Sequence, residues 1–277
     1  MRIQLFSDLH LERYPAFQPH ILPDTDVVVL AGDIGSYQEG SRLETHDFGL
    51  ERFAPATLGM PHLRVLFVPG NHEFDALDHD ETVSRLQATC ARLGIAWLDR
   101  QTIVIDGVRF VGTTLWADFD ALALRETDLT KQLQQRNKAF RAANYYLAKN
   151  TTLKDGQPVL AEGLRAMSLD CQAWLRAALA APFDGKTVVV THFAPSLMSA
   201  DPRYGVTPGT AGFCNSLDEL FKQADLWLHG HLHCLNDYVV EGRDGALSWS
   251  CRVVANPLGY LSKGEQEGFR KELVIAL

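Results

Sequence analysis

Two histidines in the C-terminal part of the chain have the spacing of a metal-ligand pair. His231 and His233 lie two residues apart, directly after a short apolar run. At strand-like spacing, residues i and i+2 project to the same side of the chain. Neutral imidazole is a common ligand for zinc, iron, nickel and copper. A single His-x-His pair is weak evidence for a metal, so its meaning depends on what other segments supply.

Four other short segments supply further candidate ligands, and each follows an apolar run typical of a strand. The runs are residues 2–7, 26–31, 63–68 and 187–191. The side chains that follow them are Asp8 and His10, Asp33, Asn71 and His72, and His192. Sites in open α/β sheets form at the carboxyl ends of strands, so we expect all five segments to meet. Histidines that only fill a core would have no reason to gather there.

Seven of these side chains can serve as metal ligands, which is too many for one tetrahedral ion. They suit two ions about 3.5–4 Å apart that share a bridging group. A carboxylate can bridge, and Asp33 is the natural candidate. The seven are Asp8, His10, Asp33, Asn71, His192, His231 and His233. The sequence therefore predicts a binuclear metal centre.

The segments between these motifs predict an α/β fold. Continuous apolar runs such as 26–31 mark strands that are buried on both faces, as in parallel sheets covered by helices. Apolar periodicity predicts helices over 82–93 and 160–178. A helix over 43–57, where the pattern is less periodic, and a short helix over 217–223 are also expected. The pair Asp106-Gly107 predicts a tight turn within a hairpin over 102–115. Alternating segments at 238–241, 247–255 and 272–277 predict antiparallel strands that close a second sheet.

No linker or repeat interrupts the chain, so we interpret residues 1–277 as one domain. Residues 117–157 are more polar than their neighbours and predict a helical excursion that forms a lid over the site. A plain pair of surface helices explains the same pattern equally well. A second excursion, the loop 199–216, is rich in Pro, Gly and Ser. If both lie near the site, they select the substrate.

Composition limits the class of protein and its partners. The 277 residues are 46% hydrophobic and 22% charged, with a net charge of −8, as expected of a globular α/β protein. Without a basic stripe, long nucleic acids are poor partners. We expect no membrane span, and no signal peptide, because a strand begins at the N-terminus. Five scattered cysteines without Cys-x-x-Cys spacing favour a reduced, cytoplasmic protein.

Taken in order, the five motifs resemble the calcineurin-like metallophosphoesterase superfamily. They are Asp8-x-His10, Gly32-Asp33, Gly70-Asn71-His72-Glu73, a strand-terminal His192, and Gly230-His231-x-His233. The resemblance implies a four-layer α/β/β/α sandwich, in which helices flank two central mixed sheets. It also implies that one metal is held by Asp8, His10, Asp33 and His233. The second metal would be held by Asp33, Asn71, His192 and His231, with His72 as the catalytic or phosphate-contacting histidine.

The chemistry implied is metal-dependent hydrolysis of a phosphoester. Two divalent ions polarise the phosphoryl oxygens, and a bridging hydroxide attacks phosphorus in line with the leaving oxygen. His72 can protonate the leaving group or stabilise its charge. The mixed oxygen and nitrogen ligands admit Mn, Fe, Zn, Ni or Co. We expect a small or medium substrate, with a phosphodiester favoured over a phosphomonoester; the oligomeric state is not determined.

The sequence leaves open other enzyme activities and a role without catalysis. The protein-phosphatase branch carries an arginine shortly after Gly-Asp, but here Asp33 is followed by Ile34-Gly35, which argues against that branch. Arg203 could contact phosphate instead, although a surface arginine is the simpler interpretation. A non-catalytic scaffold would be expected to lose ligands or His72, and a nuclease would need a basic surface.

Three residues in or beside the motifs that are not candidate ligands are interpreted as structural. His229 should point away from its motif, and Glu73 and Asp75 are acceptors near the site by sequence proximity only. Three further histidines, His46, His62 and His79, are expected at the surface.

Overall fold

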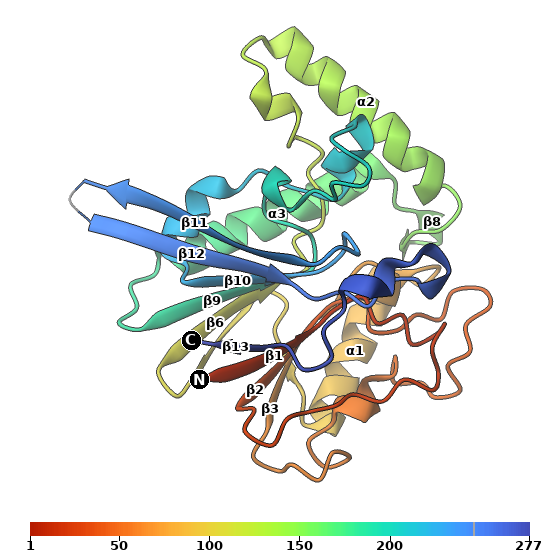
Figure 1. The fold of residues 1–277 in the computed structure, drawn as a ribbon. Helices are drawn as coiled ribbons and strands as arrows, with labels where there is room; N and C mark the ends of the chain where they lie inside the picture. The colour runs from red at the N-terminus through yellow and green to blue at the C-terminus, as the bar shows by residue number, and fades with distance from the viewer. Residues whose placement is uncertain (246) are drawn as a thin grey trace.

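The computed structural model describes residues 1–245 and 247–277, and two mixed sheets dominate it (Figure 1). The first sheet has the strand order β13-β1-β2-β3-β4. Its strands are β1 (Arg2–Phe6), β2 (Val27–Ala31), β3 (Arg64–Val68), β4 (Ala96–Trp97) and β13 (Val274–Ala276). The second sheet has the order β11-β12-β10-β9-β6-β5. Its strands are β5 (Gln101–Ile105), β6 (Val108–Thr113), β9 (Lys186–Thr191), β10 (Leu226–His229), β11 (Asn236–Asp244) and β12 (Leu247–Ala255).

Apolar side chains on both faces of the strands explain this stacking. In β2, Val27 and Val29 belong to the core shared by the two sheets, whereas Val28 and Leu30 belong to the core on the helical side. The shared core also includes Val188 from the second sheet. Alternate residues of a strand point to opposite faces, so a continuous apolar run is what a strand with two covered faces requires.

Helices cover the outer faces of the sheets. The helix α1 (His79–Leu93) packs near β4, and α3 (Ala161–Ala180) packs on β6. The side chain of Asp78 caps α1 by accepting the N–H groups of Asp80 and Glu81, and Gly94 ends it in a left-handed conformation. The four-layer α/β sandwich and the helices expected at 82–93 and 160–178 are therefore confirmed.

The parallel strands place their carboxyl ends together. In the first sheet β1, β2 and β3 are mutually parallel, and in the second β9 and β10 are parallel. The loops that follow these five strands carry the five motifs. The hairpin predicted at 102–115 is also present, with β5 and β6 paired antiparallel around Asp106-Gly107.

Two expectations about secondary structure are wrong. The helix expected at 43–57 is reduced to the 3-10 helix η1 (Leu50–Phe53), because Phe48 and Gly49 both have positive φ angles that no right-handed helix can include. Residues 272–277 do not join the second sheet. The strand β13 instead pairs antiparallel with β1, which brings the two ends of the chain side by side (Figure 1).

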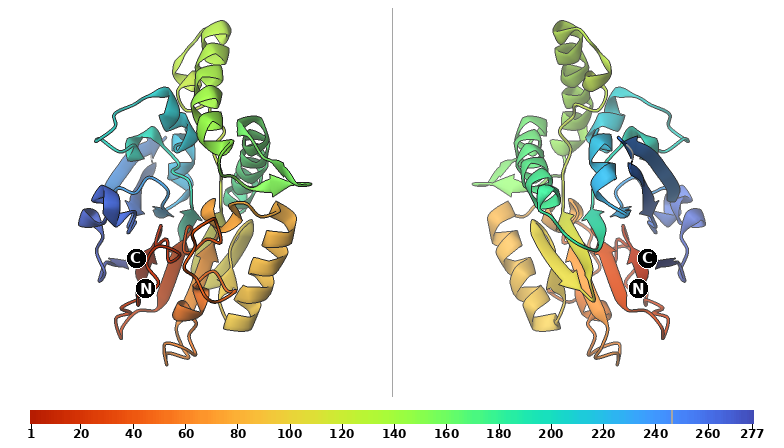
Figure 2. Two further views of the ribbon diagram at one scale, coloured as in Figure 1. Left: turned by 90° about the vertical axis from the view of Figure 1, so that its right-hand side faces the viewer. Right: turned by 90° about the vertical axis from the view of Figure 1, so that its left-hand side faces the viewer.

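The 117–157 segment stands out from the sandwich (Figure 2). It contains η3 (Ala123–Arg125), the long helix α2 (Leu129–Leu147) and the small strands β7 (Leu153–Lys154) and β8 (Gln157–Pro158). The helix α2 packs chiefly on η5 (Pro208–Gly212), which belongs to the 199–216 loop. The helix expected at 217–223 is the 3-10 helix η6 (Asp218–Gln223). Of the helices in the described residues, none combines the length and apolar character needed to cross a membrane.

Candidate metal centre

The structure brings all the predicted ligand residues to one place. Two clusters of possible metal-binding atoms form, and within each the atoms lie within 4.8 Å of one another. One cluster contains Asp8, His10, Asp33 and His233, and the other contains Asp33, His192 and His231. Asp33 belongs to both clusters, as a bridging carboxylate would. Asn71 joins the second cluster, because its Oδ1 lies 3.2 Å from His192 Nε2.

Five of these residues adopt the left-handed backbone conformation, which was not foreseen from the sequence. Their φ angles are 51° for Asp8, 47° for His10, 54° for Asp33, 71° for His231 and 49° for His233. Such a conformation costs a non-glycine residue about 1–3 kcal/mol and persists only where the surroundings impose it. At three of the five, hydrogen bonds between loops hold it: Asp8 N donates to Gly32 O at 3.0 Å, His10 N to Asp33 O at 3.1 Å and His231 N to Asp8 Oδ1 at 2.9 Å.

Two glycines allow the loops after β2 and β3 to approach closely. A Cβ atom on Gly32 would lie 2.7 Å from Gly70 N, and one on Gly70 would lie 2.5 Å from Asp33 N. Such separations are shorter than van der Waals contact, so both positions require glycine. The Gly-Asp and Gly-Asn-His motifs are therefore one packed unit, and this packing places Asp33 beside Asn71.

Buried Glu73 holds these two loops together. Its carboxylate accepts backbone N–H groups from Gly70 at 2.7 Å, Asp33 at 3.0 Å, Ile34 at 2.6 Å and Gly35 at 3.2 Å. Burial and the nearby Asp33 charge raise the pKa of Glu73 to about 7. The structural interpretation of Glu73 fits this geometry, in which it contacts backbone rather than a ligand histidine.

In the first cluster, two histidines present nitrogen atoms toward a common point. His10 Nε2 and His233 Nε2 are 3.0 Å apart. His233 Nδ1 lies 2.6 Å from Glu265 Oε2, so Nδ1 donates its proton to the carboxylate and Nε2 is left to bind elsewhere. His10 Nδ1 lies 3.3 Å from Glu12 Oε1 and 3.4 Å from the Tyr260 hydroxyl. Two nitrogens about 2.1 Å from one ion are about 3 Å apart when their bonds meet at a right angle.

In the second cluster, His192 is oriented by the main chain. Its Nδ1 donates to Ala31 O at 2.9 Å. Its Nε2 therefore faces Asp33 Oδ2 at 3.2 Å. The ring of His231 packs between Phe193 and Phe213, at centroid distances of 3.9 and 5.0 Å. Each histidine is held by groups outside the cluster, which is the arrangement that positions a metal ligand.

Three buried carboxylate oxygens, Asp8 Oδ2, Glu12 Oε1 and Asp33 Oδ2, accept no hydrogen bond among the described residues. Asp8 and Asp33 belong to the clusters, and Asp33 Oδ2 lies 3.2 Å from His192 Nε2. Burial raises the pKa of Asp8, but the hydrogen bond and charge of His233 outweigh it, so the pKa falls to about 2. Burial likewise opposes the charges of His192 and His72, which hold the pKa of Asp33 well below its usual range. Ionised, buried oxygens that accept no hydrogen bond are costly, and bound divalent cations would satisfy those of Asp8 and Asp33.

His72 lies beside the clusters and is held by Asp75. Its Nδ1 hydrogen-bonds to Asp75 Oδ2, and its Nε2 lies 3.9 Å from Asp33 Oδ2. Burial alone would lower the pKa of His72. The charges of Asp75 and Asp33 outweigh that effect and raise the pKa to about 10. Its side chain is 23% exposed, whereas that of Asp33 is 1% exposed. His72 can therefore carry a proton and still reach a substrate.

Three residues at the site are not part of any of the five motifs and were not predicted as site residues. Glu12, Tyr260 and Glu265 contact the ring nitrogens of His10 and His233. Glu12 follows His10 by two residues, and that proximity was the one available clue. Tyr260 and Glu265 come from the segment after β12, where nothing in the spacing connects them with the histidines.

Other candidates lie away from the clusters. Arg203 pairs with Asp201 and donates to His233 O at 3.1 Å, so its guanidinium is already engaged. His229 contacts Ser199 Oγ at 3.0 Å on the far side of its motif.

The three histidines interpreted as surface residues differ among themselves. His46 and His62 are exposed, as expected. His79 is partly buried and stacks on Phe74 at 5.0 Å, so its surface interpretation is wrong.

Comparisons with known proteins support the resemblance. The family model described as calcineurin-like phosphoesterase matches residues 1–235. The crystal structure of Phosphopantetheinyl Hydrolase (PptH) from Mycobacterium tuberculosis aligns with a TM-score of 0.63 and 18% identity, covering 96% of this chain and 92% of that chain. Another crystal structure aligns with a TM-score of 0.45 and 12% identity, covering 95% and 92%. No curated protein matches the chain significantly.

The structural alignment and the family match support different conclusions, the first about the fold and the second about the family. At 18% identity, the alignment with PptH shows a shared fold. The family match extends over most of the chain and includes all five motifs. The chain therefore belongs to the calcineurin-like phosphoesterase family and is a hydrolase of phosphoester bonds.

Proposed function

We propose that this protein hydrolyses phosphodiesters at a centre of two divalent metal ions. The observation that carries this proposal is the position of Asp33, whose carboxylate belongs to both clusters of possible ligands. The buried oxygens of Asp8 and Asp33 that accept no hydrogen bond among the described residues support it further. One ion would be held by Asp8, His10, Asp33 and His233. The other would be held by Asp33, Asn71, His192 and His231.

The two ions, once bound, would polarise the phosphoryl oxygens and supply a hydroxide nucleophile near neutral pH. The donor set mixes carboxylate, amide and imidazole groups, which suits Mn, Fe, Zn, Ni or Co. Asn71 is the one uncharged oxygen donor among the ligands. A neutral amide there limits the negative charge that an incoming phosphate anion must approach.

His72 would supply the proton that the leaving oxygen needs. Its hydrogen bond to Asp75 fixes the ring, and its partial exposure lets Nε2 face a bound substrate. A positioned proton donor is most valuable when the leaving group is a poorly stabilised alkoxide. His72 is thus the residue of this site that would act on the substrate directly.

Charge favours a diester over a monoester. A diester enters as a monoanion, whereas a monoester approaches a double negative charge at neutral pH, since its second pKa is about 6. Six buried carboxyl groups surround the centre. They are Asp8, Glu12, Asp33, Glu73, Asp75 and Glu265. We therefore place diesters first and monoesters second.

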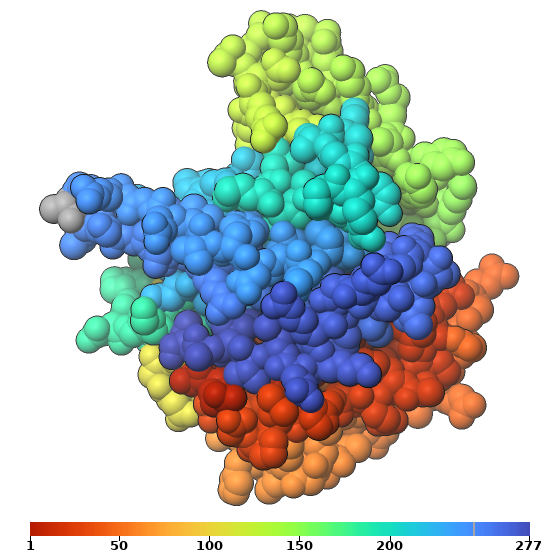
Figure 3. Space-filling view, in the orientation of Figure 1, coloured from red at the N-terminus to blue at the C-terminus, as the bar shows by residue number. Residues whose placement is uncertain are grey.

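Two excursions would select the substrate. Phe213, in the 199–216 loop, lies 5.0 Å from the His231 ring. The helix α2 packs on η5 of the same loop. The space-filling view shows this loop between α2 and the rest of the molecule (Figure 3). We propose that the 117–157 segment acts on the site through this loop, as a lid would.

The test is hydrolysis of bis(4-nitrophenyl) phosphate beside 4-nitrophenyl phosphate. The protein is stripped of metal with a chelator and then resupplied with Mn²⁺. Diester turnover that depends on added metal supports the proposal. Turnover of the monoester alone replaces it with a phosphomonoesterase. No turnover of either ester, with two ions bound per chain, points to a non-catalytic scaffold.

A further inference from the structure

A cavity of about 420 Å³ opens beside the candidate metal centre. It forms where the turn after His10, the loop around residue 42 and the segment after β12 come together. Its lining residues are Arg13, Tyr14, Arg42, Tyr260, Leu261, Ser262 and Lys263. Figure 3 shows the segment after β12, in dark blue, against the N-terminal part of the chain, in red. We refer to this cavity as the Arg13–Arg42–Lys263 pocket.

The pocket is joined to the centre through one shared residue. Tyr260 lines the pocket, and its ring stacks on His10 with a centroid distance of 4.4 Å. The backbone carbonyl of His10 also accepts the N–H groups of Arg13 at 2.7 Å and Tyr14 at 3.2 Å. Tyr260 is therefore in contact with both the pocket and a candidate metal ligand.

The pocket concentrates positive charge in an acidic protein. The chain carries 26 basic and 34 acidic residues, yet this cavity is lined by three cations and by no acidic residue. Within the described residues, Arg13 and Arg42 form no ion pair. Lys263 approaches only Glu265 Oε1, at 4.0 Å, and lies over the Tyr260 ring. Arg13 and Arg42 are therefore available to a ligand, and Lys263 adds positive charge beside them.

Hydroxyl groups complete a site suited to phosphate. The Tyr14 hydroxyl accepts Leu261 N at 2.7 Å, which leaves its own proton free to donate. Ser262 contributes a second hydroxyl. Arginine forks bind phosphate oxygens in pairs, and hydrogen bonds between charged partners are about twice as strong as neutral ones.

We propose that the Arg13–Arg42–Lys263 pocket binds a second phosphate group of the substrate, on the part of the molecule beyond the scissile phosphoester. The inference deepens the proposed function and rests on it. It narrows the substrate class to phosphodiesters that carry a further phosphate. The pocket would then supply the local positive charge that the overall composition does not.

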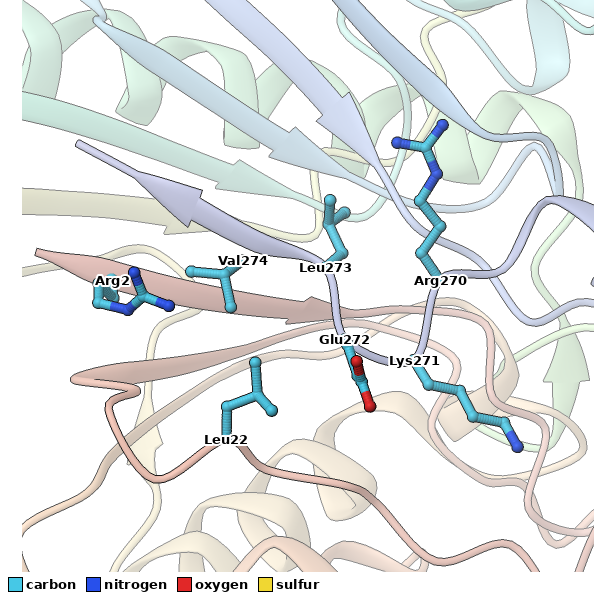
Figure 4. A pocket seen from close by; sticks show the side chains of 7 residues that line it. All are labelled: Arg2, Leu22, Arg270, Lys271, Glu272, Leu273 and Val274. Atoms are coloured by element: carbon cyan, nitrogen blue, oxygen red, sulfur yellow. The ribbon is translucent and has the colours of Figure 1, made fainter.

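A second cavity on the molecule provides a control. It has a volume of about 580 Å³ and is lined by Arg2, Leu22, Arg270, Lys271, Glu272, Leu273 and Val274. Figure 4 shows Arg270 and Lys271 pointing in different directions, and Arg2 pairs with Asp24 at 2.9 Å. Its charges are mixed and divergent, so we expect no phosphate site there. Lys271→Ala removes one positive charge at this cavity.

The first experiment measures binding without catalysis. Metal-free wild-type protein, Arg42→Ala and Lys271→Ala are each titrated with inorganic pyrophosphate in a calorimeter. Arg42 is exposed, and its backbone N–H alone contacts Glu12, so its replacement should leave the fold intact. We expect wild type and Lys271→Ala to bind equally and Arg42→Ala to bind at least about tenfold more weakly. No wild-type binding, or equal losses in the two variants, would overturn the proposal.

The second experiment measures selectivity with a matched pair of substrates. Thymidine 5′-(4-nitrophenyl phosphate) is compared with the same compound carrying a 3′-phosphate, and the readout is the ratio of their kcat/KM values. In wild type and Lys271→Ala we expect about a tenfold preference for the 3′-phosphorylated compound. In Arg42→Ala we expect the ratio to approach one. A wild-type ratio of one overturns the pocket, whereas failure to cleave either compound counts against the proposed function and leaves the binding experiment to judge the pocket.

Discussion

At the scale of residues, Asp33 holds the centre together. One oxygen of its carboxylate accepts the N–H of His72 at 2.8 Å, and the other has no hydrogen-bond partner among the described residues. The same carboxylate lies within both clusters of possible ligands. A single substitution here should therefore affect two ions, which no other candidate ligand should do.

We expect Asp33→Asn to lower the metal content at both positions. The amide removes one negative charge from each cluster and offers only one oxygen for binding. The measurement is elemental analysis after loading with Mn²⁺ and removal of excess metal. Asp75→Asn serves as control, because Asp75 contacts His72 rather than a cluster. A metal content equal to that of wild type would show that Asp33 does not bridge.

We expect His72→Ala to retain both ions and to turn over about 10²–10⁴-fold more slowly. The loss should be larger for a diester with an alkyl leaving group than for one with a nitrophenyl leaving group, because nitrophenolate needs little protonation. The measurement compares kcat for the two esters alongside metal content. Equal losses for both leaving groups would assign His72 to phosphate binding, and an unchanged rate would remove it from the mechanism.

We expect Glu265→Gln to weaken metal binding by about 10–100-fold. Glu265 accepts the Nδ1 proton of His233 at 2.6 Å and so directs Nε2 toward the cluster. The measurement is titration of metal-free protein with Mn²⁺, and Glu267→Gln in the same segment is the control. Equal affinities for the two variants would show that His233 is oriented without Glu265.

At the scale of elements, five strands deliver the site and their end residues adopt unusual conformations. Asp8, Asp33 and His231 directly follow a strand or its first loop residue, and all three have positive φ angles. The strands could be predicted because apolar runs depend on local sequence. The conformations could not, because hydrogen bonds between loops far apart in the chain impose them.

We expect Gly70→Ala to destabilise the protein by about 1–3 kcal/mol. The new Cβ atom would lie 2.5 Å from Asp33 N, and moving that backbone would displace the carboxylate. The measurement is the free energy of unfolding together with metal content. Gly209→Ala is the control, because a Cβ there would meet its nearest atom, Thr207 Oγ1, at 3.6 Å. If the two variants have the same free energy of unfolding, the close approach of the two loops does not require glycine at position 70.

At the scale of the whole molecule, the sequence predicted which residues lie together better than it predicted the path of the chain. The seven candidate ligands and His72 could be found because each follows a recognisable strand. The segment after β12 could not be placed, since Tyr260 and Glu265 reach the centre by tertiary packing alone. For the same reason the sequence predicts the wrong sheet for β13. The alternation of residues 272–277 indicates a strand, but it does not indicate that the strand pairs with β1.

Metal binding should stabilise the whole fold, because the loops that hold the ligands join both sheets. Among the described residues, one oxygen of Asp8 and one of Asp33 are buried and accept no hydrogen bond, and both carboxylates have a lowered pKa. A ligand at 100 times its dissociation constant stabilises the folded state by about 2.7 kcal/mol. One kcal/mol raises Tm by about 2–4 °C in a chain of this size. We therefore expect Mn²⁺ to raise the Tm of metal-free protein by about 5–10 °C and that of Asp33→Asn by much less. If stripped and loaded wild-type protein melt at the same temperature, the buried carboxylates are not metal ligands.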